Sequence, residues 1–290
     1  CFTEEGVTVF ENPYAFPIGF SAENDLVLET GLYSTDLFQI QNNLFQTFAG
    51  ERTDRLLNEA NGITRRLENL QPFTEENESG YRKINPATDG FLTWEIQIER
   101  SDPLYFLIDT PYRGNTAVAE VFINDGSGES YLSQDRYGIL PLGRFAPSET
   151  VTIRLKLLQP QLALGEPTFV YEDLAALSVL SQKMQAKAVA LQKISSSHLA
   201  GTVTVPAEDS YLFFSIPFDE GWTIRIDGIE TASIPVFGAL TAVPVTPGTH
   251  SVDLRYRPPG FLIGAGISAA AVILLAAWLI LRKRRGAGNP

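Results

Sequence analysis

The sequence contains few of the residues that build covalent or metal cross-links. Its 290 residues include one cysteine and two histidines, too few for an internal disulfide framework or a Cys/His zinc cage. Cations are also scarce, since 22 lysines and arginines stand against 34 aspartates and glutamates, giving a net charge of −12. This balance argues against a nucleic-acid partner. Because the chain also lacks catalytic and cofactor motifs, we expect no cofactor, no metal site and no catalytic residue in it.

A long uncharged segment near the C-terminus is the strongest positive feature. Residues 261–281 read FLIGAGISAAAVILLAAWLIL, which is 21 residues without a charge. As a helix this segment would be about 31 Å long, close to the thickness of a bilayer's hydrocarbon core. A buried helix of a soluble protein rarely runs so far without a polar face. The sequence therefore predicts a transmembrane helix over residues 260–281, with the lipid bilayer as a partner.

Basic residues on the two sides of this helix predict its orientation. Four cations, residues 282–285, follow the helix directly, whereas Arg255 and Arg257 precede it. The larger cluster is expected to stay in the cytoplasm. The tail over residues 282–290 is then cytoplasmic, and residues 1–259 are extracytoplasmic. Without the tail cations, 18 basic and 34 acidic residues remain, a charge of about −16.

Export of residues 1–259 requires a signal that the first residues do not supply, because they contain no initiator methionine and no basic segment followed by an apolar one. Three explanations fit. The chain is cut from a longer protein whose earlier helices direct export, or a signal peptide has been removed, or the protein is tail-anchored with its N-terminus inside. Cys1 would suit a mature lipoprotein, whereas the charge distribution opposes the third explanation.

Alternating apolar residues predict strands over most of the remaining chain. Leu92, Trp94, Ile96 and Ile98 alternate with polar residues, and the segment around 151–157 does the same. We expect a β-rich N-terminal domain over residues 1–170, with a sandwich over roughly residues 80–160. A short helix near residues 36–49 would begin after Ser34-Thr35 and end at Gly50.

A connecting helix and a second β domain are predicted after residue 170. Six apolar residues between positions 174 and 191 share one helical stripe, which predicts an amphipathic helix over 172–194 within a connecting segment at 171–197. A small β-sandwich-like domain would follow over 198–259, with a tight hairpin at Asp227-Gly228. The expected fold is thus mainly β, with two β-sandwich-like extracytoplasmic domains, a joining amphipathic helix and one C-terminal transmembrane helix.

Three motifs resemble those of the YfhO family of bacterial membrane proteins. Residues 216–228 read IPFDEGWTIRIDG, similar to the family's I-P-Y-x-x-G-W-x-x-x-x-D-G, and residues 248–261 read GTHSVDLRYRPPGF, similar to G-x-H-x-I-x-L-x-Y-x-P-P-G-F. Near the start, NPYAFPIGF at residues 12–20 resembles N-x-x-A-L-P-x-G-Y, with Phe16 and Phe20 as conservative departures. The motifs cover both ends of the chain, and the middle matches less well.

The resemblance implies a function for the longer protein. Family members are polytopic proteins similar to GT-C glycosyltransferases, and they are linked to adding sugars to teichoic acids or related envelope polymers from lipid-phosphate donors. Their catalytic acidic residues are expected in an early extracytoplasmic loop, to which nothing in this sequence corresponds. The resemblance therefore implies a C-terminal extracytoplasmic region plus a last membrane helix. The expected partners are the remaining helices of the parent chain and an envelope glycopolymer.

Two groups of residues are candidates for binding and for helix packing. Trp222 with Asp219 and Asp227 could form a sugar site, because aromatic rings stack on sugar CH groups and carboxylates bind hydroxyls. The simpler interpretation places Trp222 in the core, Asp219 in a turn and Asp227 in the hairpin. The small residues Gly260, Gly264 and Ser268 recur every four positions and would let another membrane helix approach closely.

Two functions remain open at this level. The chain is either an auxiliary module of a membrane glycosyltransferase that guides the acceptor polymer, or a surface protein anchored by one helix whose β domains bind a glycan or a protein.

Overall fold

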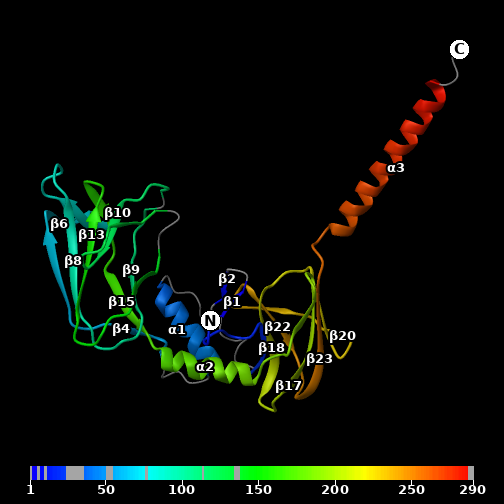
Figure 1. The fold of residues 1–290 in the computed structure, drawn as a ribbon, viewed down its shortest axis with the longest axis horizontal. Coiled ribbons are helices and arrows are strands. Elements are labelled where there is room, and N and C mark those ends of the chain that lie inside the picture. The colour runs from blue at the N-terminus through cyan, green and yellow to red at the C-terminus, as the bar shows by residue number, and fades with distance from the viewer. Residues whose placement is uncertain are drawn as a thin grey trace. The chain divides into compact units, whose positions relative to one another are not determined.

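The computed structural model describes residues 2–4, 7–9, 12–23, 36–49, 55–75, 78–112, 114–133 and 138–286. The chain divides into two compact units (Figure 1). Unit 1 comprises Cys1–Tyr14 and Gly31–Leu180, and unit 2 comprises Ala15–Thr30 and Ser181–Pro290. Both units are built mainly of antiparallel strands, as the sequence predicts.

Unit 1 contains two main sheets and a smaller one. The five-stranded sheet has the order β11 (Glu129–Tyr131), β10 (Ala119–Ile123), β13 (Thr150–Leu157), β8 (Gly90–Gln97) and β5 (Ile63–Glu68). The four-stranded sheet has the order β12 (Leu140–Gly143), β9 (Leu104–Ile108), β15 (Pro167–Glu172) and β4 (Leu57–Glu59). The smaller sheet contains β14 (Gln161–Ala163), β7 (Glu78–Lys83) and β6 (Leu70–Glu75), and β1 (Phe2–Glu4) pairs with β2 (Val7–Val9).

The core of unit 1 lies between its two main sheets. Alternation on β8 directs Leu92, Trp94 and Ile96 inward, and all three are buried. Trp94 packs between Phe106 of β9 and Phe169 of β15, with ring centroids 5.7 Å and 5.9 Å away. Since one apolar cluster includes side chains of both sheets, the predicted sandwich is confirmed.

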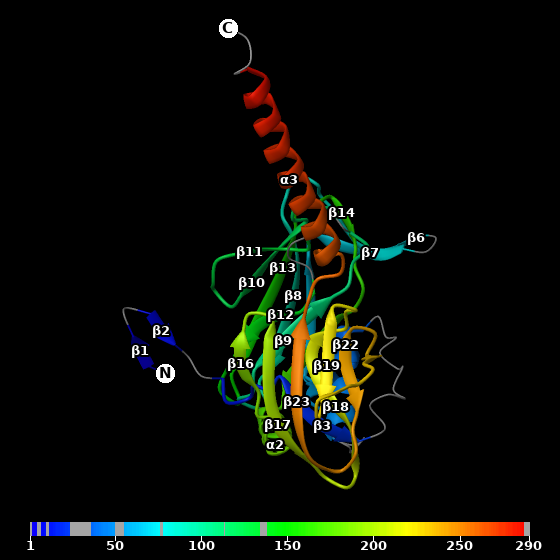
Figure 2. The same ribbon diagram turned by 90° about the vertical axis from the view of Figure 1, so that its right-hand side faces the viewer.

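Unit 2 is a second, smaller sandwich (Figure 2). Its five-stranded sheet has the order β16 (Gln192–Ser195), β17 (His198–Val205), β23 (Gly248–Tyr256), β19 (Trp222–Ile226) and β20 (Ile229–Glu230). Its four-stranded sheet has the order β21 (Ile234–Val236), β22 (Leu240–Pro244), β18 (Asp209–Pro217) and β3 (Gly19–Glu23). Val203, Ile224 and Leu254 of the first sheet share a core with Leu212 and Phe214 of the second.

Strand β3 belongs to unit 2, although the sequence patterns favoured one N-terminal domain over all of residues 1–170. It pairs antiparallel with β18, and Phe20 and Ala22 are buried there. The Ser21 hydroxyl donates to the carboxylate of Asp209, which lies 188 residues later in the chain. A five-residue strand carries no signal that identifies so distant a partner, which is why the sequence did not predict this pairing.

The two helices before the membrane segment differ in how well the sequence predicts them. α1 spans Leu37–Ala49, and the carboxylate of Asp36 caps it by accepting hydrogen bonds from the backbone N–H groups of Phe38 and Gln39. The predicted cap at Ser34-Thr35 and the predicted end at Gly50 lie outside the described residues.

The connecting helix is shorter than predicted. α2 spans Leu174–Ala186, not 172–194, because the next residues form strand-like hydrogen bonds. Val189 N–H donates to the Gly19 carbonyl and Ala190 N–H to the Thr202 carbonyl. The residues that follow form β16. The apolar stripe therefore continues past the helix into the sandwich.

The C-terminal helix α3 spans Phe261–Gly286. Its segment Phe261–Arg282 is long and apolar enough to cross a membrane, with a mean hydropathy of 2.3 and no part buried within the structure. This segment agrees with the predicted membrane helix. β23 leads into α3 through Arg257-Pro258-Pro259-Gly260, so one end of the unit 2 sandwich is tied to the start of the helix.

Candidate functional site

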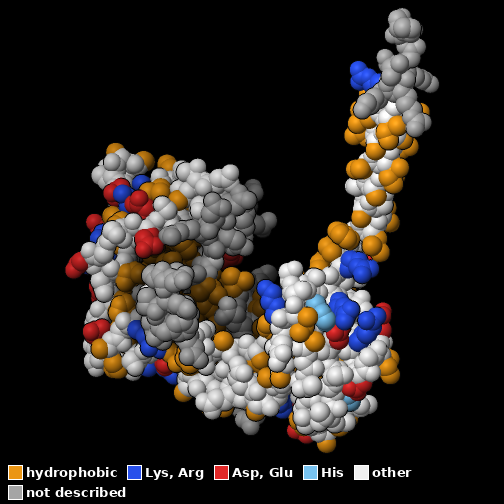
Figure 3. Space-filling view, turned by 45° about the vertical axis from the view of Figure 1, so that its right-hand side comes forward, with side chains coloured by type: hydrophobic (Ala, Val, Ile, Leu, Met, Phe, Trp, Pro, Cys, Tyr) orange, Lys and Arg blue, Asp and Glu red, His pale blue; other side chains and the backbone are white. Residues whose placement is uncertain are grey.

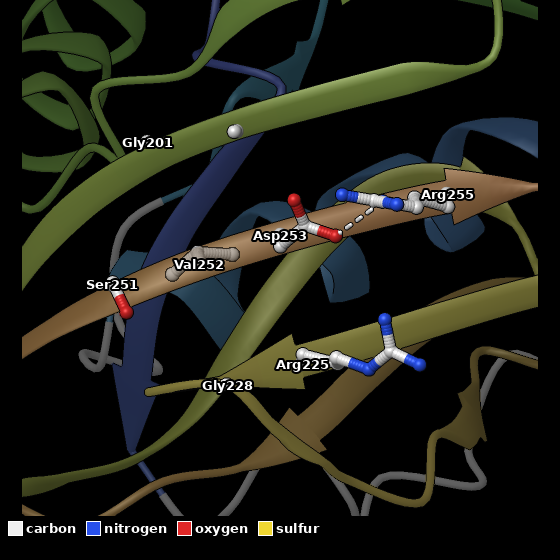
Figure 4. Close-up of a pocket in the computed structure, with 8 residues that line it drawn as sticks. Gly201, Arg225, Gly228, Ser251, Val252, Asp253 and Arg255 are labelled. Atoms are coloured by element: carbon white, nitrogen blue, oxygen red, sulfur yellow. Dashed lines mark hydrogen bonds and ion pairs between the residues drawn. The ribbon is translucent and has the colours of Figure 1, made fainter.

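The outer face of the five-stranded sheet of unit 2 carries a row of charged side chains. On β19 and β23 the buried residues alternate with polar ones, so Thr223, Arg225, Asp253 and Arg255 face away from the core. Figure 4 shows Arg225 and Arg255 on these neighbouring strands. In Figure 3 lysine and arginine side chains gather on unit 2 next to the start of α3.

Two hollows follow this face, and they share Arg225 and Arg255. The one nearer the membrane helix, which we call the arginine groove, has a volume of about 710 Å³ and also includes His198, Thr223 and Arg257 in its lining. The other has a volume of about 650 Å³ and continues along the sheet past Asp253 toward Ser251. The arginine groove is the candidate binding site because three arginines line it together.

Strand register sets the positions of these side chains along the groove. Thr223 lies opposite Arg255 on β23, and Arg255 lies opposite His198 on β17. Arg225 follows Thr223 by two residues on the same face, and Arg257 follows Arg255 by two residues. Thr223 therefore has Arg255 directly opposite on β23, Arg257 diagonally across and Arg225 next along its own strand.

Asp253 positions two side chains of this cluster. Its Oδ1 atom accepts a hydrogen bond from Arg255 Nε at 2.9 Å, and its Oδ2 atom lies 2.6 Å from His198 Nε2. Burial alone would raise the pKa of Asp253, but the hydrogen bonds from His198 and Arg255 lower it overall. Asp253 is therefore ionised at neutral pH and fixes the direction of Arg255.

The other two arginines are less constrained. Arg225 approaches Glu230 at 3.5 Å, and both side chains are substantially exposed, so this ion pair contributes little. Arg257 is exposed, and its side chain has no hydrogen-bond or ion-pair partner among the described residues. Two of the three guanidinium groups can therefore reorient toward a ligand.

The residues predicted as a sugar site do not line this groove. Asp219 accepts a hydrogen bond from Gly221 N–H at 2.7 Å, which stabilises the turn before β19. Trp222 is half-buried, packs on the Tyr256 ring at 5.0 Å and contacts the unit 2 core. Asp227 lies at the opposite end of β19, about 16 Å along the strand from Trp222. The structure thus separates Asp227 from the other two, and substrate binding by these residues stays a prediction.

Asp227 instead organises the hairpin and the start of β23. Asp227 and Gly228 have φ values of 52° and 79°, as in a two-residue hairpin turn. The Asp227 carboxylate accepts hydrogen bonds from Ser251 N–H at 2.8 Å and from His250 Nδ1 at 2.7 Å. His250 Nε2 lies 2.8 Å from the Thr246 carbonyl. Because both ring nitrogens face acceptors, this site favours the charged imidazolium.

The small-residue row at the membrane helix is exposed. A Cβ atom added to Gly260 or Gly264 would meet nothing within 4 Å, and Ser268 is exposed as well. The row is available to another helix, and its packing role stays a prediction.

Within the described part of the chain, no group of three or more His, Cys, Asp or Glu side chains could hold a metal ion. The sequence patterns did not identify Thr223, Arg225 and His198 as a group. The alternation on β19 shows which residues face outward, but only the register with β17 and β23 brings them together.

Comparison with solved structures gives a distant likeness. A conserved protein of unknown function from Pseudomonas aeruginosa aligns over 67% of this chain and 93% of its own length, at 11% identity and a TM-score of 0.17. That score is too low to support a conclusion about fold or function.

Comparison with known sequences is more informative. A Bacillus subtilis (strain 168) protein described as "Uncharacterized protein YfhO" is 34% identical over 84 residues, which are 28% of this chain and 9% of that protein. The matched stretch thus spans a small part of a much longer relative. The family described as "Bacterial membrane protein YfhO" matches residues 3–268. Because this match covers most of the chain and ends within α3, the chain belongs to the YfhO family of bacterial membrane proteins.

Proposed function

We propose that this chain is the C-terminal extracytoplasmic module and last membrane helix of a longer protein that transfers sugars to cell-envelope polymers such as teichoic acid. The observation that carries the proposal is the length of the relative, since the matched 84 residues are only 9% of it. The family's resemblance to GT-C glycosyltransferases supports an earlier membrane loop as the location of the catalytic residues.

The module itself serves a non-catalytic role, either guiding the acceptor polymer or supporting the membrane domain. Two sandwiches with their own cores supply rigid surfaces for either role. The basic residues at the end of α3 favour an extracytoplasmic location for both sandwiches. Within the described residues, no side-chain cluster has the geometry of a glycosyl-transfer site.

The coding sequence upstream of Cys1 tests this proposal. About ten or more hydrophobic segments of membrane-spanning length would support it. A signal peptide ending in a lipobox at Cys1 would contradict it and favour the surface protein anchored by one helix.

A biochemical test addresses whether this chain transfers sugars without the rest of the parent protein. The 290-residue chain, purified in detergent and supplied with a polyprenyl-phosphate sugar and a teichoic acid acceptor, should show no sugar transfer, whereas the complete parent protein should. Turnover by the 290-residue chain alone would contradict the auxiliary role.

A further inference from the structure

The arginine groove lies close to the point at which the chain enters the bilayer. Phe261–Arg282 contains 22 residues, about 33 Å of helix, which matches the hydrocarbon core with Phe261 at one boundary. Arg257 precedes Phe261 by four residues, so the two Cα atoms are at most about 14 Å apart. The headgroup layer adds about 5–7 Å on each side, and a long arginine side chain spans part of the remaining distance.

The groove presents the donors that a phosphate group requires. Guanidinium groups bind phosphate oxygens through paired N–H donors, and the hydroxyl of Thr223, which also lines the groove, supplies one more donor. Arg255 is held in place by Asp253 at 2.9 Å, whereas Arg225 and Arg257 can turn toward an incoming ligand. One fixed and two adjustable cations along the groove can together bind one phosphate group.

The charge of the groove also limits what it binds. Glu220 and Glu230 line it together with the three arginines, and Asp253 pairs with Arg255 beside it, so the arginine charges are largely balanced. A surface for a long polyanion would instead carry an extended excess of cations. The acidic residues therefore favour one phosphate group over a phosphate-rich polymer.

We infer that Arg225, Arg255, Arg257 and Thr223 form a binding site for the phosphate group of an anionic membrane phospholipid. The site fixes the end of the unit 2 sandwich against the headgroup layer, next to the start of α3. This inference does not depend on the proposed sugar transfer, since it concerns only the sheet face and its distance from the membrane segment.

Native mass spectrometry of the 290-residue chain in non-ionic detergent tests the inference, with phosphatidylglycerol and phosphatidylcholine titrated separately. Phosphatidylglycerol should bind more tightly than phosphatidylcholine. Arg255→Gln together with Arg257→Gln should weaken the tightest phosphatidylglycerol site about tenfold or more, because each lost charge-assisted hydrogen bond contributes about that factor. Thr223→Val, which keeps the side-chain shape, should weaken it less but measurably.

A matched control separates the site from general charge effects. Arg65→Gln together with Arg66→Gln removes the same charge from exposed positions on β5, and every variant keeps the basic residues at the end of α3. The control should bind phosphatidylglycerol like the unchanged chain. Equal weakening in both double variants, or no weakening in the groove variant, would overturn the inference. Displacement of the lipid by an equal concentration of inorganic phosphate would show a free-anion site and overturn the assignment to a lipid.

Discussion

At the scale of single residues, Trp222 is the position where a sugar platform and a packing residue are hardest to distinguish. Its indole packs on Tyr256 and on the unit 2 core while remaining half-buried. We expect Trp222→Ala to lower the free energy of unfolding of unit 2 by about 2–3 kcal/mol, below the range for a fully buried tryptophan. Urea denaturation followed by proteolytic susceptibility of unit 2 measures the change.

The same variant distinguishes the two interpretations of Trp222. If the indole is a packing residue, glycan binding per folded molecule should be unchanged. A variant that keeps its full stability but loses binding to an envelope glycan would identify Trp222 as a sugar platform.

His250 gives a second prediction, on pH dependence. The hydrogen bond that His250 donates to Asp227 raises the pKa of His250 above 6.5, with burial opposing the shift and the Thr246 carbonyl adding to it. The chain contains only two histidines, so NMR of ¹³C-labelled histidine in the detergent-solubilised chain resolves each one. His250 should titrate above pH 6.5. Asp227→Asn should return its pKa toward 6.5, and Asp125→Asn in an exposed turn should not change it.

The sign of the linked stability effect follows from the two pKa shifts. Because the pKa of His250 is raised in the folded state, the ionised imidazolium stabilises the fold. This contribution to the free energy of unfolding is complete below about pH 6.5 and is lost as the pH rises through the raised pKa. The pKa of Asp227 is lowered, chiefly by the same hydrogen bond, so its contribution disappears as the pH falls through that lowered value. A His250 pKa at or below 6.5 in the unchanged chain would contradict the hydrogen-bonded geometry.

The sequence patterns predicted which face of a strand each side chain occupies, but not which strand lies beside it. Ile224 and Ile226 alternate with polar residues, so the sequence alone places Thr223 and Arg225 on the outer face of a strand. It does not reveal that β23 lies alongside with Arg255 opposite Thr223. β19 and β23 are not joined by a hairpin, so no turn in the sequence fixes their register. The sequence therefore grouped Asp227 with Trp222 because they are close along the chain, whereas the structure places Asp227 at the far end of the strand.

At the scale of elements, the prediction succeeded where one face of a strand is buried. β13 alternates strictly and β8 does so apart from the buried Thr93, and both appear within a residue or two of their predicted bounds. β3 was missed as a member of unit 2 because its residues GFSAE lack such alternation and all but Glu23 are buried. α2 was predicted too long because its stripe of apolar residues continues past the helix into Ala188 and Leu191, and Leu191 packs against the sandwich core.

The buried carboxylate of Asp209 attaches β3 and the segment after α2 to β18. Its side chain is 0% exposed and lies 2.8 Å from Lys187 Nζ, and it accepts the Ser21 hydroxyl. Asp209→Ala should destabilise unit 2 by about 3–5 kcal/mol, because it leaves Lys187 largely buried without its partner. Hydrogen exchange should show loss of protection first in β3.

A double variant tests whether the lost partner is the cause. Asp209→Leu with Lys187→Met removes both charges and should be less destabilising than Asp209→Ala. If the double variant is the less stable of the two, the cost arises from packing and not from the unpaired ammonium group.

The row of small residues on α3 predicts that another membrane helix packs against it. Gly260, Gly264 and Ser268 leave one face of the helix without bulky side chains, which allows a second helix to pack closely. Gly264→Leu with Ser268→Leu should therefore lower the folded yield of the parent protein in membranes, as measured by fluorescence-detected size exclusion. Ile273→Leu, a change in the same helix that keeps its volume, is the control. Normal yield and activity of the double variant would show that α3 is only an anchor.

At the scale of the whole molecule, chain order and spatial order differ. Unit 2 combines residues 15–30 with residues from 181 onward. Its four-stranded sheet is therefore complete only when β3, near the start of the chain, is present together with β18, β21 and β22. α3 contributes nothing to either core, since no part of its membrane segment is buried within the structure. The stability of the sandwiches therefore rests on contacts among residues before the membrane helix.

This independence makes a fragment of residues 1–258 the decisive test of the whole fold. It keeps every strand of both sandwiches, and it carries all 34 acidic residues against 18 basic ones, an excess of negative charge that opposes aggregation. We expect soluble protein whose circular dichroism is predominantly β, and no sugar transfer from a polyprenyl-phosphate donor. A shorter fragment, residues 31–258, lacks β3 and should be less stable in unit 2, because Phe213 and Phe214 of β18 lose a neighbouring strand. A mainly helical spectrum of the longer fragment would overturn the fold, and equal stability of the two fragments would show that β3 is dispensable.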